Sequence, residues 1–319
     1  MKILANDGIE KSAQVKLEAA GFEVSTKKAE QTELANTINS NEFTALLVRS
    51  ATQVRKEVID NCPKLKLIGR GGVGMDNIDV EYAKSKLIKV INTPAASSQS
   101  VAELVMGHMF SMSRFLADSN RMMPLQGESK FNDLKKKYAK GKELRGKTLG
   151  IIGFGRIGQA LAKYALGCGM KVIATDPFIS IATIDIMIEG LGKVSITLQT
   201  IPFQEVIIKS DFISLHVPKQ SNGKPVISKT ELDLMKNGVC LINASRGGLI
   251  DENSLIEALN SGKVDHAALD VFENEPTPQK GLLIHPKISL TPHTGASTNE
   301  AQERIGDELA DQIIDFFKN

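Results

Sequence analysis

The sequence predicts an α/β protein that is built on parallel sheets and divided into two domains. Short runs rich in β-branched residues alternate with segments of helical spacing along almost the whole chain, which is typical of repeated βαβ units. The length of 319 residues is more than one domain usually holds. Hydrophobic residues make up 42% of the chain and charged residues 24%, so each domain has enough apolar side chains for its own core.

The first series of elements occupies the N-terminal part of the chain. We expect strands at 2–5, 43–49, 65–69 and 89–92, and helices at 9–20 and 53–61. A longer helix then begins near Ser100, because Ser100 and Glu103 form a capping-box pattern before an apolar run that reaches Met123. We expect this helix to carry the chain from one domain into the next.

A second alternating series begins at Thr148. We expect strands at 148–153, 171–176, 211–217, 239–244, 265–271 and 287–291, and helices at 156–168 and 298–318. The lysine-rich segment 135–147 is interpreted as an exposed loop. The mixed periodicity of 179–200 predicts no definite element.

The composition excludes several classes of function. A formal net charge of +2 is too small to favour nucleic acid or an anionic membrane as a partner. Cys62, Cys168 and Cys240 are too far apart for a CxxC redox or zinc pattern, so we expect free thiols and no metal site. The first residues do not resemble a signal peptide and no apolar run is long enough for a membrane span. These observations together favour a cytoplasmic protein.

A glycine-rich turn predicts a dinucleotide site. The segment GFGRIG (153–158) follows a predicted strand and opens a predicted helix, and Asp176 ends the next strand. In this Rossmann-type arrangement Gly153 permits the tight turn, Gly155 lets the backbone approach a pyrophosphate, and Gly158 allows close helix packing. Asp176 is suited to bind the ribose hydroxyls, and its charge would repel a 2′-phosphate. The sequence therefore predicts NAD as the cofactor.

Three charged residues follow predicted strands of the second series. Arg246 follows the strand 239–244, Glu275 comes after 265–271, and His293 comes after 287–291. Ligands of open α/β sheets bind at the carboxyl ends of the strands, so we expect these side chains to converge there. An arginine suits a substrate carboxylate, a histidine suits proton transfer, and a nearby carboxylate fixes the histidine tautomer. The other histidines are expected to be core or surface residues: His108, His216, His266 and His285.

The segments NASRGGLID (243–251), ALDVFENEP (268–276) and PHTGAST (292–298) resemble the signatures of the D-isomer-specific 2-hydroxyacid dehydrogenases, an NAD-dependent enzyme family. The resemblance implies that Arg246 holds the substrate, that His293 is the acid/base and that Glu275 pairs with it. It also implies a set of cofactor contacts, with Asp270 at the nicotinamide carboxamide: Gly153, Gly155, Arg156, Ile157, Gly158, Asp176, Ala244, Asp270 and Ser100.

The resemblance further implies a topology that periodicity alone does not predict. A flavodoxin-like substrate domain is expected from residues 1–98 and 293–319. The Rossmann-type NAD-binding domain is expected at 99–292, inserted between those two parts, with the active site in the cleft. As in the family, the long helix at Ser100 suggests a homodimer surface. The sequence stops after the last helix, so we expect no C-terminal regulatory domain of the kind that senses serine in longer members.

Other segments resemble the 3-phosphoglycerate dehydrogenases within that family. They are VRSAT (48–52), GRGGVGMDNID (69–79), NTPAASSQSVAEL (92–104) and HTGASTNEAQERIG (293–306). Arg49 and Arg70 suit a terminal phosphate, and the backbone N–H groups of Gly72, Val73 and Gly74 suit a carboxylate. The residues AASS (95–98) depart from the pattern of relatives that often carry an asparagine there, so we expect local contacts to differ at this point.

The expected reaction is NAD-dependent oxidation of 3-phospho-D-glycerate to 3-phosphohydroxypyruvate, the first step of serine biosynthesis. The alternative is reduction of hydroxypyruvate or glyoxylate, or another D-2-hydroxyacid dehydrogenase activity. Some relatives act as peptide-binding corepressors, but this chain has no low-complexity arm to support that role.

Overall fold

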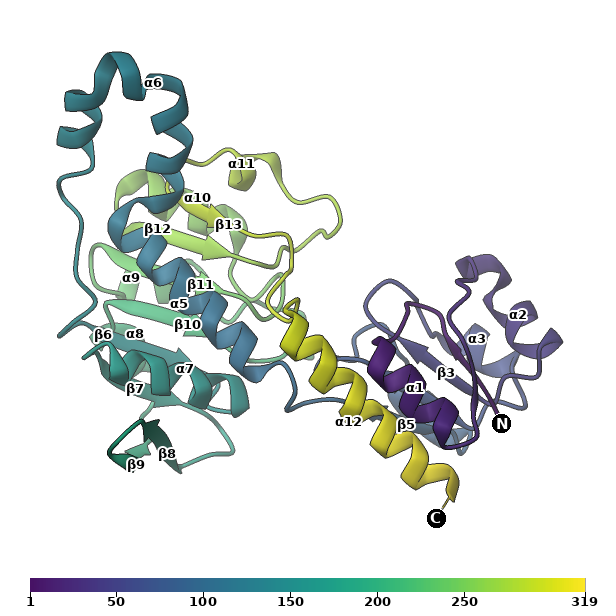
Figure 1. The fold of residues 1–319 in the computed structure, drawn as a ribbon. Coiled ribbons are helices and arrows are strands. Elements are labelled where there is room, and N and C mark those ends of the chain that lie inside the picture. The colour runs from purple at the N-terminus through teal and green to yellow at the C-terminus, as the bar shows by residue number, and fades with distance from the viewer. Residues whose placement is uncertain (319) are drawn as a thin grey trace. The chain divides into compact units, whose positions relative to one another are not determined.

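The computed structural model describes residues 1–318, which divide into two compact units (Figure 1). The first unit contains Met1–Ser98 and the segment that begins at Ala296, and the second contains Gln99–Gly295. The second unit is therefore inserted into the first. The second crossing point falls three residues after the expected one at 293, so His293 belongs to the second unit.

The first unit has a five-stranded parallel sheet in the order β2-β1-β3-β4-β5. This is the flavodoxin-like strand order, as predicted. The strands are β1 (Lys2–Ala5), β2 (Glu23–Ser25), β3 (Ala45–Val48), β4 (Leu67–Arg70) and β5 (Lys89–Asn92). The helices are α1 (Lys11–Ala19), the 3-10 turn η1 (Gln31–Glu33), α2 (Leu34–Ser40), α3 (Lys56–Asp60), α4 (Val80–Ser85) and α12 (Asn299–Lys318).

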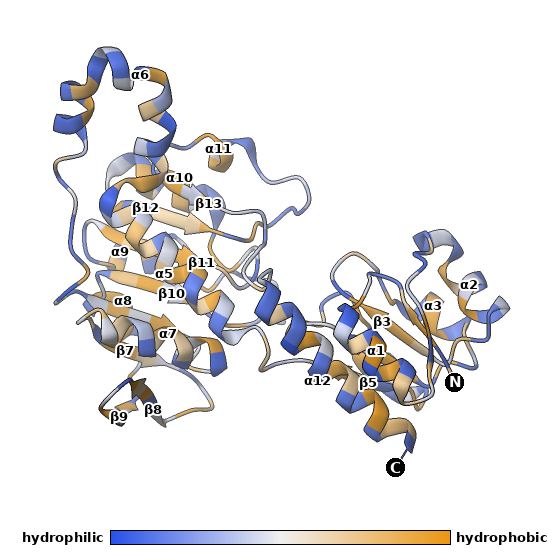
Figure 2. Cartoon of the chain, viewed as in Figure 1, coloured by the Kyte–Doolittle hydropathy of each residue, from blue (hydrophilic) through white to orange (hydrophobic). Residues whose placement is uncertain are grey.

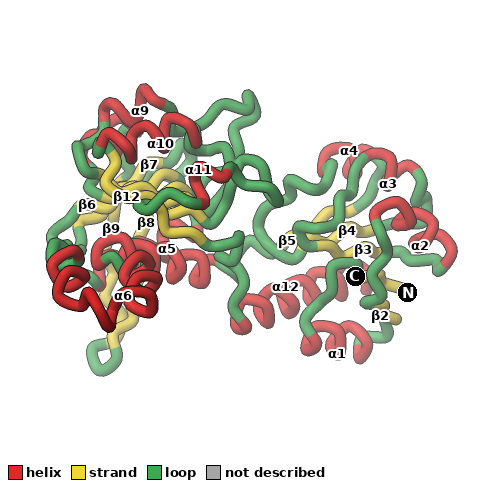
Figure 3. Tube along the Cα trace, turned by 90° about the horizontal axis from the view of Figure 1, so that it is seen from above, coloured by secondary structure: helices red, strands yellow, loops and turns green. Residues whose placement is uncertain are grey.

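Helices cover both faces of this sheet. Figure 3 shows α1 and α12 side by side on one face and α3 and α4 on the other. Because both faces are covered, every residue of β3 is buried, as expected for a parallel sheet. A side chain at Gly306 of α12 would lie 2.9 Å from the Ala13 Cβ of α1, so this glycine allows the two helices to pack closely.

The second unit has a six-stranded parallel sheet in the order β13-β12-β11-β10-β6-β7. Its strands are β6 (Thr148–Ile152), β7 (Lys171–Thr175), β10 (Phe212–Leu215), β11 (Val239–Asn243), β12 (Val264–Leu269) and β13 (Ile288–Leu290). Its helices are α5 (Ser98–Arg114), which starts at the crossing, α6 (Leu116–Lys137), α7 (Arg156–Gly167), α8 (Phe203–Lys209), α9 (Lys229–Leu234), α10 (Glu252–Ser261) and α11 (Lys280–Leu283). Figure 2 shows the apolar strands at the centre of the unit.

The order of the strands explains where the cofactor turn lies. Strand β6 is central and pairs with β7 on one side and β10 on the other, so the chain reverses its direction of winding at β6. This reversal is the topological switch point at which doubly wound sheets bind ligands. The Rossmann-type prediction is confirmed, with one difference at the edge beyond β7.

The segment 179–200, for which no element was predicted, forms an antiparallel hairpin of β8 (Ile181–Ile188) and β9 (Gly192–Gln199). It stands where a classical Rossmann sheet has its third strand, and an isolated bridge between Ala174 and Thr200 lies between β7 and the end of the hairpin. One face of the hairpin packs on the core around α7, with Ile184 fully enclosed. The opposite face is mixed: Asp185 accepts a hydrogen bond from Ser195 there, and the apolar Ile181 and Met187 are exposed.

The single helix expected from Ser100 to Met123 is wrong. Phe115 has a left-handed φ of 56°, which ends α5 and starts α6. Because α5 already begins at Ser98, Ser100 lies inside the helix and is not its N-cap. The lysine-rich segment is not wholly a loop either, since Lys135–Lys137 form the last turn of α6. No helix within residues 1–318 has both the length and the apolar character that a membrane span requires.

Candidate active site

The glycine turn joins β6 to α7 at the switch point of the second sheet. Gly153 has a φ of +94°, and a Cβ there would lie 2.4 Å from the His216 carbonyl oxygen. A Cβ at Gly158 would lie 2.3 Å from the Gly153 carbonyl oxygen, so the helix can approach the strand only with glycine at this position. These contacts explain two of the three glycines by space alone.

Gly155 differs from its two neighbours in the motif. It is the N-cap of α7, its φ is −71°, and a Cβ built on it would meet nothing within 4 Å. Open space in front of the N-terminus of a twelve-residue helix suits a pyrophosphate, because the first N–H groups of a helix point outward there. The turn therefore fits a dinucleotide. Arg156 and Ile157 begin this helix.

Asp176 follows β7 beside the same turn. One carboxylate oxygen accepts a hydrogen bond from the Phe154 N–H at 2.7 Å, and the other accepts from the N–H groups of Phe178 and Ile179. The carboxylate thus ties the glycine turn to the end of β7. The oxygen that accepts from Phe154 has a further lone pair with which it can bind a ribose hydroxyl. The sequence pattern predicted the position of Asp176 but not its bonds to the backbone.

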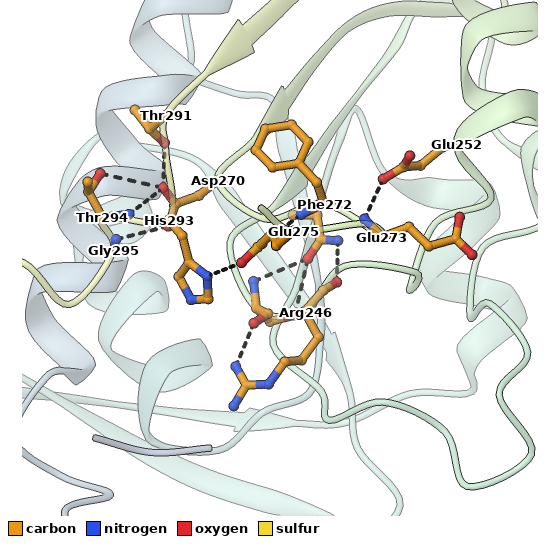
Figure 4. Close-up of polar contacts among 12 residues, drawn as sticks. Arg246, Glu252, Asp270, Phe272, Glu273, Glu275, Thr291, His293, Thr294 and Gly295 are labelled. Atoms are coloured by element: carbon orange, nitrogen blue, oxygen red, sulfur yellow. Dashed lines mark hydrogen bonds and ion pairs between the residues drawn. The ribbon is translucent and has the colours of Figure 1, made fainter. Parts of the chain in front are cut away.

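His293 and Glu275 form a hydrogen-bonded pair at the carboxyl edge of the second sheet (Figure 4). The His293 Nδ1 and the Glu275 Oε2 lie 2.7 Å apart, and the other oxygen, Oε1, accepts the Phe272 N–H at 2.9 Å. The side chains of His293 and Glu275 are 46% and 35% exposed in this structure, so both are accessible to a ligand. His293 has a left-handed φ of 55°, which is uncommon outside glycine.

Arg246 lies on the loop after β11, near the His293–Glu275 pair (Figure 4). Its Nη1 donates a hydrogen bond to the Ser245 carbonyl oxygen at 2.6 Å, and the Asn243 side chain donates to the Arg246 carbonyl oxygen. Ala244 is buried at the start of the same loop. The second unit alone therefore brings together the three charged residues that the sequence singled out.

The loop that carries Glu275 is fixed by contacts that the sequence did not reveal. A Cβ at Gly247 would lie 1.7 Å from the Phe272 carbonyl oxygen, so the Arg246 loop and the Glu275 loop touch through their backbones. The buried Glu252 accepts the Glu273 N–H at 2.8 Å, and burial raises the pKa of the Glu252 carboxyl. Such backbone partners leave no motif in a sequence.

Asp270 is buried, with a relative exposure of 1%. Its Oδ1 accepts the Thr291 hydroxyl at 2.6 Å and the Thr294 N–H at 2.8 Å, and its Oδ2 accepts the Gly295 N–H at 2.9 Å. These donors come just before and just after His293 in the chain. Besides any contact with the cofactor, Asp270 therefore binds the turn on which His293 lies.

A pocket of about 450 Å³ opens beside the His293–Glu275 pair. Apart from those two residues and Thr291, its lining is apolar: Phe272, Pro276, Pro278, Leu283, Leu290 and Pro292. The pair thus lies between polar loops on one side and an apolar surface on the other.

The residues expected to bind the substrate lie in the first unit and are described within it. Arg49 and Arg70 come at the carboxyl ends of β3 and β4, which are paired neighbours. The Arg49 guanidinium donates a hydrogen bond to the Gln302 side chain of α12.

Ser100, which was expected to contact the cofactor, belongs to the second unit and is buried in the first turns of α5.

The glycine-rich loop after β4 corrects one expectation. The Gly71 N–H donates to the Val48 carbonyl oxygen, and the Gly72 N–H donates to the Thr93 hydroxyl at 2.8 Å. The Gly72 N–H is therefore already used inside the protein and is not open to a carboxylate. Within residues 1–318, Val73 and Gly74 keep N–H groups with no recorded acceptor, so any anion site on this loop is smaller than predicted.

Comparisons with known proteins agree with this site. The model of the NAD binding domain of D-isomer specific 2-hydroxyacid dehydrogenases matches residues 106–295. A hydroxypyruvate reductase from Thermotoga maritima is 45% identical over 317 residues, which are 98% of this chain and 97% of that protein. A D-3-phosphoglycerate dehydrogenase from Methanocaldococcus jannaschii is 43% identical over 314 residues, which are 98% of this chain but 57% of that protein.

A solved structure is similar over the whole chain. The NAD⁺-bound 3-phosphoglycerate dehydrogenase in Entamoeba histolytica has a TM-score of 0.79 at 29% identity, and the match covers 100% of this chain and 96% of that one. The fold and the glycine turn define an oxidoreductase that uses NAD. The chain belongs to the family of D-isomer specific 2-hydroxyacid dehydrogenases.

His216 allows a pH-dependent prediction. Its backbone N–H donates to the Ile152 carbonyl oxygen, and its ring Nε2 lies 2.9 Å from the Ser214 hydroxyl. Burial lowers the pKa of the His216 ring from 6.5 to about 4. Below pH 6.5 the unfolded chain therefore binds a proton that the folded protein excludes. The stability that comes from the neutral ring is present above that pH. It is lost as the pH falls toward 4, by about 1.4 kcal/mol per pH unit.

We predict that His216→Gln loses less stability on acidification than the wild type, by up to about 1.4 kcal/mol per pH unit in this range. Urea unfolding of the protein without cofactor, at a series of pH values, measures the difference. His285→Gln is the matched control. Because His285 is less buried, this substitution should change the slope of unfolding free energy against pH less. Equal slopes for wild type and His216→Gln would contradict the assignment of a neutral His216.

Proposed function

We propose that the protein oxidises 3-phospho-D-glycerate to 3-phosphohydroxypyruvate with NAD, as the first step of serine biosynthesis. The observation that carries this proposal is the His293–Glu275 pair, which lies beside Arg246 at the carboxyl edge of the NAD-binding unit. The reaction removes a proton from the C2 hydroxyl and a hydride from C2. It therefore needs a base, a carboxylate anchor and a hydride acceptor in one place.

His293 is the proposed base, and the geometry supports one tautomer. A carboxylate only accepts hydrogen bonds, so the proton between His293 and Glu275 belongs to Nδ1. The Nε2 of the neutral ring is then left with its lone pair and takes the hydroxyl proton of the substrate. Glu275 stabilises the imidazolium that forms, and the Phe272 N–H keeps that carboxylate in position.

Arg246 is the proposed anchor for the carboxylate and the C2 oxygen of the substrate. Its guanidinium offers several donors in a fixed plane, and Nη1 donates to the Ser245 carbonyl oxygen. The turn Gly153–Gly158 would hold NAD, which would supply the hydride acceptor. Gly155 is the proposed contact of the pyrophosphate and Asp176 that of the ribose. Asp270 and Ala244 are the proposed contacts near the nicotinamide.

Arg49 and Arg70 are the proposed phosphate ligands, so the first unit is the proposed substrate domain. The support is their position at the ends of two paired strands, together with the adjoining N–H groups of Val73 and Gly74. A phosphate ester needs two or more cationic donors, which a plain 2-hydroxy acid does not.

The alternative is reduction of hydroxypyruvate or glyoxylate by the same residues in the reverse direction. A specific observation favours it, because the hydroxypyruvate reductase of Thermotoga maritima matches this chain over 97% of its own length. His293 would then give the proton to the carbonyl oxygen of the substrate. The two proposals differ in the need for a phosphate site and not in the chemistry at C2.

We further propose a homodimer in the cytoplasm. The helix α6 extends from the second unit (Figure 1) and exposes large apolar side chains, with Leu125 at 76% and Phe131 at 57%. Such a face is stabilised when a second copy covers it. The three cysteines are free thiols, and Cys62 and Cys240 are buried with raised pKa values, which suits a reducing compartment.

We predict that His293→Asn lowers kcat by about 10²- to 10⁴-fold, because general acid–base catalysis contributes about that much. Asparagine tolerates the left-handed φ at this position, so the turn should survive. NAD binding, measured by isothermal titration, should stay near the wild-type value, and His293→Ala should behave alike. A variant with wild-type turnover would remove His293 from the mechanism.

For the phosphate site, we predict that Arg49→Gln and Arg70→Gln each lower kcat/KM for 3-phosphoglycerate by about 10- to 100-fold. Hydrogen bonds to charged groups contribute about 1.5–3 kcal/mol, which corresponds to this range. Activity with hydroxypyruvate should change much less. Arg55→Gln is the control, since Arg55 pairs with Asp79 at the surface of the same unit. Equal losses on both substrates would exclude the phosphate role.

For the dimer, we predict that sedimentation equilibrium gives twice the chain mass for the wild type and a single chain mass for the double variant Leu125→Asp, Phe131→Asp. The control is Leu191→Asp on the hairpin, where leucine is also 71% exposed but lies away from α6. A monomeric wild type, or a double variant that stays dimeric, would refute the role of α6.

A further inference from the structure

A buried chain of polar side chains lies beneath the turn that carries His293. His108 of α5 is 5% exposed and lies among the mainly apolar residues that this helix buries. Its Nδ1 is 2.9 Å from the Ser289 hydroxyl and its Nε2 is 3.1 Å from the Thr291 hydroxyl. Thr291 in turn donates to Asp270. The proposed chemistry of the site does not use His108.

The count of donors and acceptors assigns the direction of each hydrogen bond. Thr291 has one hydroxyl proton, and it goes to the Asp270 Oδ1 at 2.6 Å. Toward His108 the Thr291 oxygen must therefore accept, which puts a proton on the histidine Nε2. The Nδ1 of the neutral ring is then an acceptor, and the Ser289 hydroxyl donates to it. Burial lowers the pKa of His108, although the nearby Asp270 charge opposes this, so a neutral ring agrees with the geometry.

We propose that His108 is a positioning residue for the reaction. It orients the Thr291 hydroxyl toward Asp270, and Asp270 holds the turn of His293; this inference rests on the proposed role of His293. Both carboxylate oxygens of Asp270 also accept N–H groups from the residues that follow His293. If Thr291 loses its partner, its hydroxyl can rotate, and the carboxylate loses one of the donors that fix it.

The turn is sensitive to such a loss because its backbone is unusual. His293 has a φ of 55°, and only surrounding contacts keep a histidine in that region. A Cβ at Gly295 would lie 3.1 Å from the Asp270 Oδ2, so the carboxylate and the turn are in close contact. A small displacement of Asp270 would therefore be passed to His293 and its distance from the substrate.

Substitutions of His108 separate the hydrogen bond from the shape. His108→Gln places an amide donor near the former Nε2 and should keep kcat within about twofold of the wild type, whereas His108→Phe fills the space without a donor and should lower kcat by about tenfold or more. Ser113→Ala is the control, because Ser113 is also buried on α5 but has no recorded partner in residues 1–318. If His108→Phe lowers the melting temperature but leaves kcat unchanged, the role is only structural and the proposal fails.

A double-mutant cycle tests the route through Thr291. If His108 acts only by way of this hydroxyl, His108→Phe should lower kcat no further in a protein that already carries Thr291→Val. Additive losses would show that His108 acts by another route and would overturn the proposal. The cycle uses kcat, so a structural loss of stability does not imitate its result.

Nitrogen-15 NMR of the unaltered protein, with the ring nitrogens of histidine labelled, tests the relay without any variant. The proposal requires a proton on the His108 Nε2 and none on Nδ1; the reverse tautomer or a doubly protonated ring would refute it. This measurement does not depend on the role of His293. Suppose that His293→Asn keeps wild-type turnover but His108 has the expected tautomer. The proposed function would then be rejected, and the hydrogen-bond chain from His108 through Thr291 to Asp270 would remain supported.

Discussion

The buried carboxylate of Asp270 is the contact on which the geometry of the candidate site depends. It accepts hydrogen bonds from Thr291 before His293 and from Thr294 and Gly295 after it. A buried carboxylate is costly unless donors surround it, so these partners are strongly favoured in the folded state. The end of β13 and the following turn are thereby fixed to the end of β12. The imidazole is held over Glu275 by this arrangement and not by the pair alone.

The same principle applies to the other loops at the carboxyl edge. Gly247 lets the Arg246 loop touch the backbone of the Glu275 loop, and Glu252 holds the Glu273 N–H from below. At the cofactor turn, Asp176 fixes Phe154 in the same manner. The turn of His293, the loop of Glu275 and the cofactor turn thus each have backbone N–H groups bound by a buried or partly buried carboxylate. His293 and Glu275 stay accessible, while Asp270 and Glu252, which hold their loops, are buried.

The sequence predicted those parts of the fold that depend on local pattern. The parallel strands, the glycine turn and the position of Asp176 follow from apolar periodicity and from the spacing of a motif, and the structure confirms them. The residues Arg246, Glu275 and His293 were predicted because strand ends of a parallel sheet meet at one edge. The flavodoxin-like order of the first sheet came only from resemblance, since periodicity does not specify strand order.

The remaining features depend on contacts between distant residues. The hairpin β8–β9 is stabilised by packing on α7, and its alternation was masked by apolar residues on both faces, such as Ile184 inside and Met187 outside. The break between α5 and α6 depends on one backbone angle at Phe115, for which a phenylalanine gives no signal. The engaged Gly72 N–H and the partners of Asp270 are backbone contacts across loops. Sequence spacing contains no information about them.

Amide hydrogen exchange in an Asp270→Asn variant measures whether this carboxylate holds the turn of His293. Asparagine has the shape of aspartate, but its NH₂ group would face the Gly295 N–H, so that two donors oppose each other. We expect faster exchange at Thr294 and Gly295, with unchanged rates in the central strand β11. Unchanged protection at both amides would contradict the claim that this carboxylate holds the turn of His293.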